Sequence, residues 1–317
     1  MRNISRLILM CCVLVCTALQ TVAQFYFYDK NTYNSPVVYE FGGSVGVMNC
    51  LTDIGGRKGI GGKFIKDLNF GNTQLNGSLY LSATYKEAFG LRIEGTMGKV
   101  KAYDSILKNV RTTTGGRYER NLSFTSTITE VALIAEIHPL FIFINWAGRE
   151  DSPPNFSPYL LGGIGFFSFN PQTVLAGKTI DLQPLHTEGQ GFTQYPDRKP
   201  YSLHQSNWLL GVGVKYALSP VINIRAEMLY RILNTDYLDD VSTRYVDPAL
   251  FAANGLSGTQ LNNALLLNDR RITFTEGVPI INNPKGGQKR GNPTNNDAYF
   301  NFNIKLGISF GRVKIRR

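Results

Sequence analysis

After residue 24 the sequence has no apolar run that reaches the ~18 residues a transmembrane helix needs. It also lacks the alanine-, leucine-, glutamate- and lysine-rich stretches of helical proteins, and it contains only 2 Trp. Tyr (16), Phe (19) and Gly (32) are abundant instead, and this composition favours β-structure with polar loops. If the chain crosses a membrane, we therefore expect a closed barrel, since lipid leaves no other way for non-helical backbone to satisfy its hydrogen bonds.

The first 23 residues are predicted to be an export signal, which leaves residues 24–317 as the mature barrel domain. The segment has a basic start, an apolar middle and a small-residue end: Arg2 and Arg6, Leu7–Leu19, and Thr21–Ala23. Polar residues interrupt the apolar stretch, so a retained helical anchor is the less favoured alternative. A lipid anchor on Cys16 is another, and it is disfavoured because Val15 precedes that cysteine.

Cysteine is scarce, and three of the four cysteines fall within the predicted signal. The mature chain then keeps only Cys50, so it cannot form an internal disulfide. The formal charge of +10 falls to about +8 once the two arginines of the signal are removed. Nucleic acid is an improbable partner, because the chain is exported and shows no basic stripe with interleaved aromatic residues. We expect the excess charge to meet the anionic headgroups of outer-membrane lipids.

Eight segments alternate apolar and polar residues with the period of a β-strand: 37–48, 75–85, 89–103, 121–139, 157–169, 205–218, 221–233 and 298–312. In the last of them Phe302 and Ile304 share one face, while Asn303 and Lys305 share the other. Segment 157–169 is apolar on both faces and fits less well. The pattern predicts an all-β fold, a transmembrane antiparallel up-and-down barrel of about eight strands.

The connections between these segments alternate in length. Four are long, at 49–74, 104–120, 170–204 and 234–297, whereas 86–88 and 219–220 are tight and 140–156 is intermediate. Long loops at one end and short turns at the other are typical of outer-membrane barrels, so we expect extracellular loops and both termini in the periplasm.

Two features leave the strand count open. Pro139 stands inside the fourth segment and cannot donate a hydrogen bond to a ladder. Either that strand ends at His138, or Phe141–Trp146 forms a ninth piece. The count rises to ten if the loop 234–297 hides a hairpin, for which Arg271–Phe274 is the candidate strand.

Charged residues recur on the polar, inward phase of the segments: Glu40, Arg92, Glu94, Glu136, Lys215, Arg225, Glu227, Arg231 and Lys305. Side chains just fill the bore of an eight-stranded barrel, and opposed charges there can pair. We predict a structural charge network that holds the barrel shut. The alternatives are an ion pathway and, with less weight, proton-transfer catalysis.

Other constellations carry less chemistry. Asp236, Asp239, Asp240 and Asp247 could bind a divalent cation, but they lack calcium-loop spacing, and a turn in which Asp side chains cap backbone amides is favoured. The chain has three histidines, His138, His186 and His204. The last two fall in one long connection, so a site there is conceivable, yet no nucleophile motif accompanies them. We expect no enzyme, no cofactor and no metal site.

Several stretches resemble a Bacteroidetes outer-membrane barrel family that includes PorG, a component of the type IX secretion system. They occur in the family's order along most of the mature chain: Arg120–Phe124, Pro158–Leu160, Gly163–Gly165, Phe169–Pro171, Leu185, Thr187–Gly191 and Thr235–Ser242. The segment 248–297 has no counterpart in that family. The resemblance implies a structural component that anchors a protein secretion assembly in the outer membrane, with periplasmic lipoprotein-ring proteins as partners.

The alternative is a surface-binding, adhesion or receptor barrel that acts through its long loops. A transport pore ranks third, because eight strands leave too little room. The chain continues beyond the last predicted strand residues as a basic tail, and its cations are candidates for contact with a periplasmic partner: Arg312, Lys314, Arg316 and Arg317. No small-molecule substrate is evident.

Overall fold

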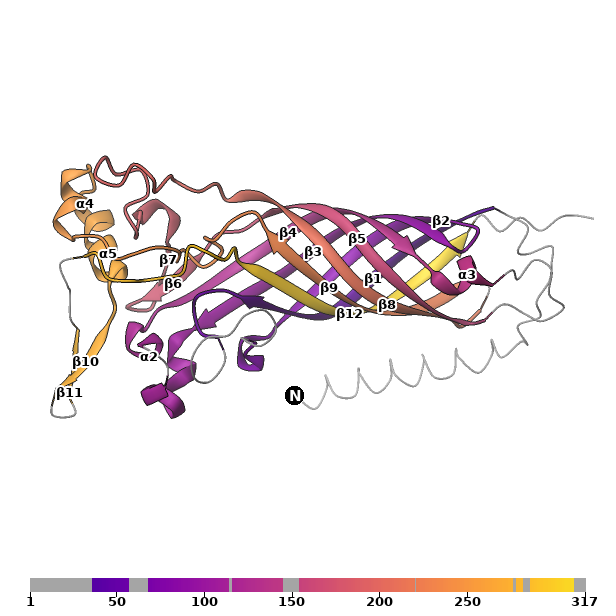
Figure 1. Ribbon diagram of the computed structural model, residues 1–317, viewed down its shortest axis with the longest axis horizontal. Helices are drawn as coiled ribbons and strands as arrows, with labels where there is room; N and C mark the ends of the chain where they lie inside the picture. The colour runs from indigo at the N-terminus through magenta and orange to yellow at the C-terminus, as the bar shows by residue number, and fades with distance from the viewer. Residues whose placement is uncertain are drawn as a thin grey trace, which may run out of the picture.

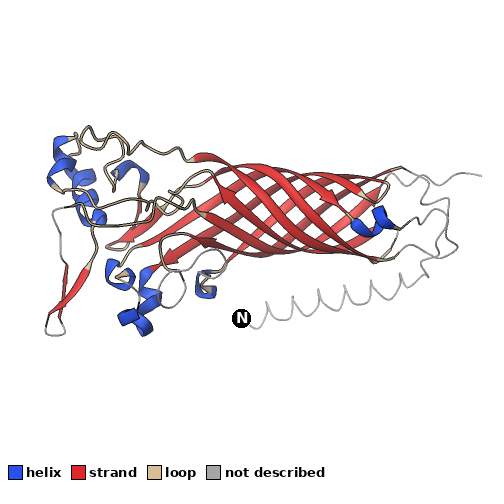
Figure 2. Cartoon of the chain, viewed as in Figure 1, coloured by secondary structure: helices blue, strands red, loops and turns tan. Residues whose placement is uncertain are grey.

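Eight antiparallel strands close into a barrel in the computed structural model (Figures 1 and 2). Its described residues are 36–56, 68–113, 116–144, 154–219, 221–275, 278–281 and 286–310. The barrel strands are β1 (Val37–Leu51), β2 (Gln74–Tyr85), β3 (Phe89–Tyr103), β4 (Ser123–Ile137), β5 (Phe156–Ser168), β8 (His204–Ala217), β9 (Ile222–Leu233) and β12 (Ala298–Phe310). β1 pairs with β12, which closes the sheet and confirms the predicted up-and-down barrel. The predicted export signal and the basic tail lie outside the described residues.

The strands alternate between a buried inner face and an exposed apolar outer face. In β12 the side chain of Ile304 is 46% exposed, whereas its neighbour Asn303 is 1% exposed. Aromatic residues ring the short-turn end of this apolar belt: Tyr39, Tyr85, Phe89, Phe156, Tyr216 and Phe310. An outward apolar band bordered by aromatic residues is what a bilayer requires of a barrel that crosses it. The outer face is therefore built for lipid.

Short connections join the strands at one end. Residues 86–88 link β2 to β3, and residues 218–221 link β8 to β9. The fourth strand ends at Ile137, and Pro139 begins a short helix, α3 (Pro139–Phe143). Proline suits the first turn of a helix, where its missing N–H is not needed. The first alternative for this segment is therefore essentially correct, and the ninth strand is wrong as far as residue 144; Trp146 lies outside the described residues.

The four long connections fold together at the other end, where they form what we call the loop cap: residues 52–56, 68–73, 104–113, 116–122, 169–203, 234–275, 278–281 and 286–297. Its short elements are η2 (Phe70–Asn72), η3 (Asp104–Thr113), α2 (Arg117–Arg120), β6 (Gln172–Leu175), β7 (Lys178–Asp181), η4 (Gln183–Leu185), α4 (Ala249–Ala253), α5 (Gly258–Asn268), β10 (Ile272–Thr275) and β11 (Val278–Ile281). Figure 1 shows α4, α5 and the β10–β11 hairpin beyond the long-loop end of the barrel. Within the described ranges, no helix is long and apolar enough to cross a membrane.

The long last connection does contain a hairpin, as one alternative proposed. β10 pairs only with β11, so this hairpin stands apart from the barrel and leaves its strand count at eight. A second hairpin, β6–β7, continues the edge of β4 through the pair Thr125 and Gln172. Extra strands therefore extend the cap and do not widen the bore.

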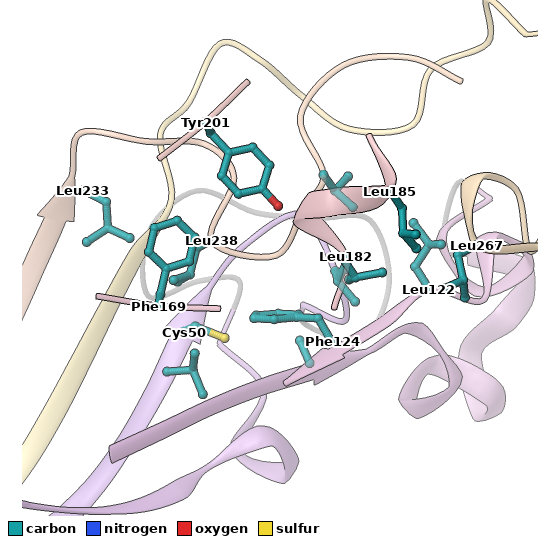
Figure 3. Close-up of a cluster of buried hydrophobic side chains, with 14 of the residues drawn as sticks. Cys50, Leu122, Phe124, Phe169, Leu182, Leu185, Tyr201, Leu233, Leu238 and Leu267 are labelled. Carbon is teal, nitrogen blue, oxygen red and sulfur yellow. The ribbon is translucent and has the colours of Figure 1, made fainter. Parts of the chain in front are cut away.

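A hydrophobic core joins the mouth of the barrel to the cap. Figure 3 shows strand-end side chains such as Cys50, Phe124 and Leu233 gathered with loop side chains such as Leu182 and Leu238. Segment 157–169 looked apolar on both faces because β5 turns Leu161 and Phe167 into the interior while Leu160 and Phe166 face outward. The interior is thus apolar at its mouth and polar nearer the short turns.

Candidate functional site: the charged interior and the latched loop cap

Arg92 is the centre of the charge network in the half of the barrel nearer the short turns. Its side chain is fully buried, and Nη1 and Nη2 donate to the two carboxylate oxygens of Glu227 at 2.6 and 3.0 Å. Nε lies 3.1 Å from Glu94, and Nη1 lies 3.0 Å from Glu136. Three carboxylates thus surround one guanidinium, whose planar fork suits bidentate pairing.

The other cations complete this layer. The ammonium of Lys305 lies 2.6 Å from Glu94 and 3.1 Å from Glu227. Arg225 bridges Glu136 at 2.9 Å and Glu40 at 2.8 Å. Lys215, nearer the short-turn rim, contacts Glu40 at 3.1 Å. Each of these buried charges therefore has a partner of opposite sign, as burial in a low-dielectric interior demands.

Arg231 stands in a separate pair with Glu130, a residue that the sequence analysis missed. The Nε of Arg231 donates to Glu130 at 2.8 Å, and its Nη1 donates to the side chain of Asn301 at 2.8 Å. Glu130 is 1% exposed and shares the inward phase of Glu136, six residues later on β4, so the strand period could have revealed it. With Glu130 included, the carboxylates and cations of the interior balance: Glu40, Glu94, Glu130, Glu136 and Glu227 against Arg92, Lys215, Arg225, Arg231 and Lys305.

A second network ties the loops of the cap together, and we call it the latch: Asp53, Asp104, Arg120, Glu188, Asp239, Asp240, Arg290 and Asp297. Arg120 donates to both oxygens of Asp104 at 2.9 Å, to the carbonyl of Arg290 at 2.8 Å and to that of Asp53 at 2.6 Å. These hydrogen bonds of Arg120 join the first, second and fourth long connections. Burial alone would lower the pKa of Arg120, but the negative charge of Asp104 outweighs this effect. The pKa of Arg120 therefore lies above its usual value.

Arg290 is the second cation of the latch. Its Nη1 lies 3.0 Å from Glu188 and donates to the carbonyl of Asp240 at 2.6 Å. Glu188 in turn accepts the backbone N–H groups of Ser242 and Thr243 at 3.0 and 2.8 Å. The fourth long connection is thereby held to the third by a buried ion pair.

The aspartates of the latch act as acceptors for backbone amides. Asp239 accepts the N–H groups of Ile54 and Val241, and Asp297 accepts that of Leu238. Burial, then the nearby charge of Asp53, raises the pKa of Asp239 to about 8. Within the described ranges there is no group of three or more His, Cys, Asp or Glu side chains that could hold a metal ion.

The histidines do not assemble an accessible site. The Nδ1 of His138 lies 3.0 Å from the hydroxyl of Ser157, and its Nε2 lies 3.4 Å from Glu136, in a Ser–His–carboxylate order. All three side chains are buried, and Glu136 is already paired with two arginines. A nucleophile needs access to substrate, which Ser157 does not have. His186, half-buried in the cap, and His204, exposed at the start of β8, share no hydrogen bond or ring contact.

Two hollows bear on the question of a site. One, of about 10 Å³, is enclosed beneath the cap beside Ile54, Leu122 and Leu267, and it has room for roughly one water molecule. The other, of about 410 Å³, lies on the outward apolar face beside Gly162 and Trp208. Neither is a bore through the barrel, and the larger has no titratable group in its lining.

Comparisons with known proteins find no matching family model and no match among curated protein sequences. Among solved structures the chain is similar to Ail, the attachment invasion locus protein of Yersinia pestis, at 9% identity and a TM-score of 0.37, over 86% of this chain and 99% of that one. It is also similar to Neisserial surface protein A, at 10% identity and a TM-score of 0.33, over 86% and 96%. OprG of Pseudomonas aeruginosa gives 10% identity and a TM-score of 0.35, over 87% and 97%. The chain's own strand pairing and outward apolar belt define it as a transmembrane β-barrel.

Proposed function

We propose that the chain is a non-enzymatic anchor in the bacterial outer membrane, whose closed barrel holds a folded loop cap at the cell surface and serves a larger assembly. The observation that carries this proposal is the filled interior. Balanced ion pairs occupy the half of the interior nearer the short turns, and apolar side chains join the mouth of the barrel to the cap. A barrel closed in this way contributes a fixed position in the membrane and a rigid surface, and it offers solutes no route.

The assembly that we favour is a protein secretion system of the type IX kind. Support comes from the stretches that resemble the PorG-containing family, because they supply four of the eight latch residues: Arg120, Glu188, Asp239 and Asp240. The resemblance thus involves residues that fold the cap. Lipoprotein-ring proteins would then bind at the short-turn end, where Lys86 lies, and the sequence adds the tail residues Arg312, Lys314, Arg316 and Arg317 as candidate contacts.

A surface-binding or adhesion barrel is the second candidate, and the size of the cap favours it. All four long connections contribute, and the helix α5 exposes Leu266 at 48%. Such a protein would act through this surface and would need nothing at the short-turn end.

Site-directed photo-crosslinking in cells separates the two candidates. A crosslinking residue replaces Lys86 in the short turn or Leu266 on α5, both of them exposed. The secretion proposal expects Lys86 to capture a periplasmic lipoprotein whose loss also blocks protein export. Capture of external ligands at Leu266 alone replaces it with the surface-binding candidate. A steady ion current through the purified protein would overturn both.

A further inference from the structure

A column of cations lies on the outer wall of the barrel just beyond the apolar belt. On β3, Lys99 follows Met97 on the outward face and Lys101 follows Lys99. Met97 is 63% exposed and marks the end of the belt on this strand. Lys99 is exposed and Lys101 half-buried, and neither makes an ion pair within the part of the chain that the structure describes.

Hydroxyl groups stand beside these lysines on the neighbouring strand. The register of β3 and β4 places Lys99 opposite Thr127 and Lys101 opposite Thr125. Both threonines face outward and are exposed. Side chains that are directly opposite in an antiparallel pair have Cβ atoms about 5 Å apart, so each lysine stem starts beside a threonine side chain.

Arg270 lies in the cap near the end of this column, where it is half-buried and also borders the small hollow beneath the cap. Its Nη1 donates at 3.4 Å to the hydroxyls of Ser123 and Thr173, which themselves bond at 2.9 Å. Ser123 is the next outward position of β4 after Thr125. The cap thus adds a third cation that is held in place by neutral groups and not by a carboxylate.

The nearest carboxylates have other partners. Asp104 is buried and paired with Arg120. Asp181, across the β6–β7 hairpin, accepts the side-chain amides of Asn170 and Gln172. The outward residues near the same end of other strands are neutral, among them Leu75, Ser168, Ser206 and Phe300. Among the outward residues of the described barrel strands, Lys99 and Lys101 are therefore the only lysine or arginine side chains.

We propose that Lys99, Lys101 and Arg270, with Thr125 and Thr127, bind the phosphate of a lipid headgroup in the leaflet at the long-loop end. The height of the column selects this occupant. Acyl chains must cover Met97, and the polar layer of the same lipids begins at the next outward position, where Lys99 stands. The barrel then has a preferred lipid contact on one side, at the outer face of β3 and β4. This role is separate from the anchoring function proposed above.

The test uses the full-length protein in non-ionic detergent micelles, titrated with phosphatidate or with the diacylglycerol of identical chains, and native mass spectrometry counts the retained lipid. Wild-type protein should retain phosphatidate over diacylglycerol. The variant Lys99→Gln/Lys101→Gln should lose about 30-fold in phosphatidate retention, roughly fivefold for each lysine near an anionic layer. The matched control Lys178→Gln/Lys199→Gln changes the net charge equally at exposed positions of the cap, away from the outward face of β3, and should retain phosphatidate as wild type does.

Equal retention of the two lipids by wild-type protein would overturn the proposal, as would an equal loss in the control variant. Shifted electrophoretic mobility on heating reports that each variant is folded, because only a folded barrel changes its mobility. If an excess of inorganic phosphate strips the bound phosphatidate completely, the column is a site for free anions and the lipid assignment is wrong. None of these outcomes bears on whether the barrel is closed.

Discussion

Arg92 on β3 and Glu227 on β9 face each other across the barrel interior, 135 residues apart in the chain, and two hydrogen bonds of 2.6 and 3.0 Å join them. No water-filled bore can pass between groups at this distance. The same guanidinium also contacts Glu94 and Glu136. One side chain therefore connects several strands and excludes solvent from the middle of the polar layer.

Replacement of Arg92 by Met should destabilise the barrel by about 3–5 kcal/mol, because buried carboxylates lose their counter-charge. Lys215→Met removes the same charge at the rim, where Glu40 keeps Arg225 as a partner, and should cost less. Urea titration of the folded fraction, followed by heat-dependent gel mobility, measures both. Equal stability losses would show that the centre of the network has no special role.

The apolar belt predicts a depth-dependent penalty for outward charge. Ile304→Arg, on the outward face of β12, should destabilise the inserted barrel by about 2–4 kcal/mol, as expected for Arg near the bilayer midplane. Thr127→Arg, outward but beyond the belt, should be nearly neutral. Folding yield in vesicles compares the two variants. If both insert as wild type does, the assigned outer face is wrong.

The loop cap should respond to pH. Burial raises the pKa of Asp236 to about 9 and that of Asp239 to about 8, so the folded cap holds protons that the unfolded chain, with pKa values near 3.8, releases. The protonated forms therefore favour the folded cap, and its stability should fall as pH rises from about 4 through 9. Limited proteolysis should cut the cap faster at pH 9 than at pH 6.

A substitution of Asp236 provides the control for this pH response. Asp236 has one carboxylate oxygen without a hydrogen-bond partner, so Asp236→Asn imitates its protonated form. This variant should flatten the pH dependence of cleavage, whereas Asp181→Asn, at an exposed position, should leave it unchanged. A cap that resists protease better at pH 9 would contradict the direction of these pKa shifts.

The barrel could be predicted from the sequence because its signal is local. Alternation along segments such as 298–312 gives both the strand and its inward face, and loop length gives the two ends. The predicted segment 121–139 is longer than β4, because nothing before Pro139 marks the end of the alternation. Glu130 has the same inward phase as Glu136, so the pattern that predicts Glu136 in the interior predicts Glu130 there as well.

The latch had no such signal. Glu188 meets Arg290 over 102 residues, and Asp53 accepts the backbone N–H of Asn292 over 239 residues. No periodicity encodes contacts between loops of unrelated length. The sequence indicated Asp239 and Asp240 as capping aspartates and, through the family resemblance, Arg120 and Glu188, but it gave no sign of Asp53, Asp104, Arg290 or Asp297. The cap also depends on the hydrophobic core at the barrel mouth, whose side chains come from strand ends and loops that are far apart in the sequence.

The central claim is that the barrel is closed, and conductance of the purified protein in a planar bilayer tests it most directly. Balanced ion pairs and the apolar mouth predict no steady single-channel current at moderate voltage in wild-type protein. A variant without Arg92 serves as the control, because its loss of charge pairing should produce openings if any change does. A large and stable current through wild-type protein would contradict the account.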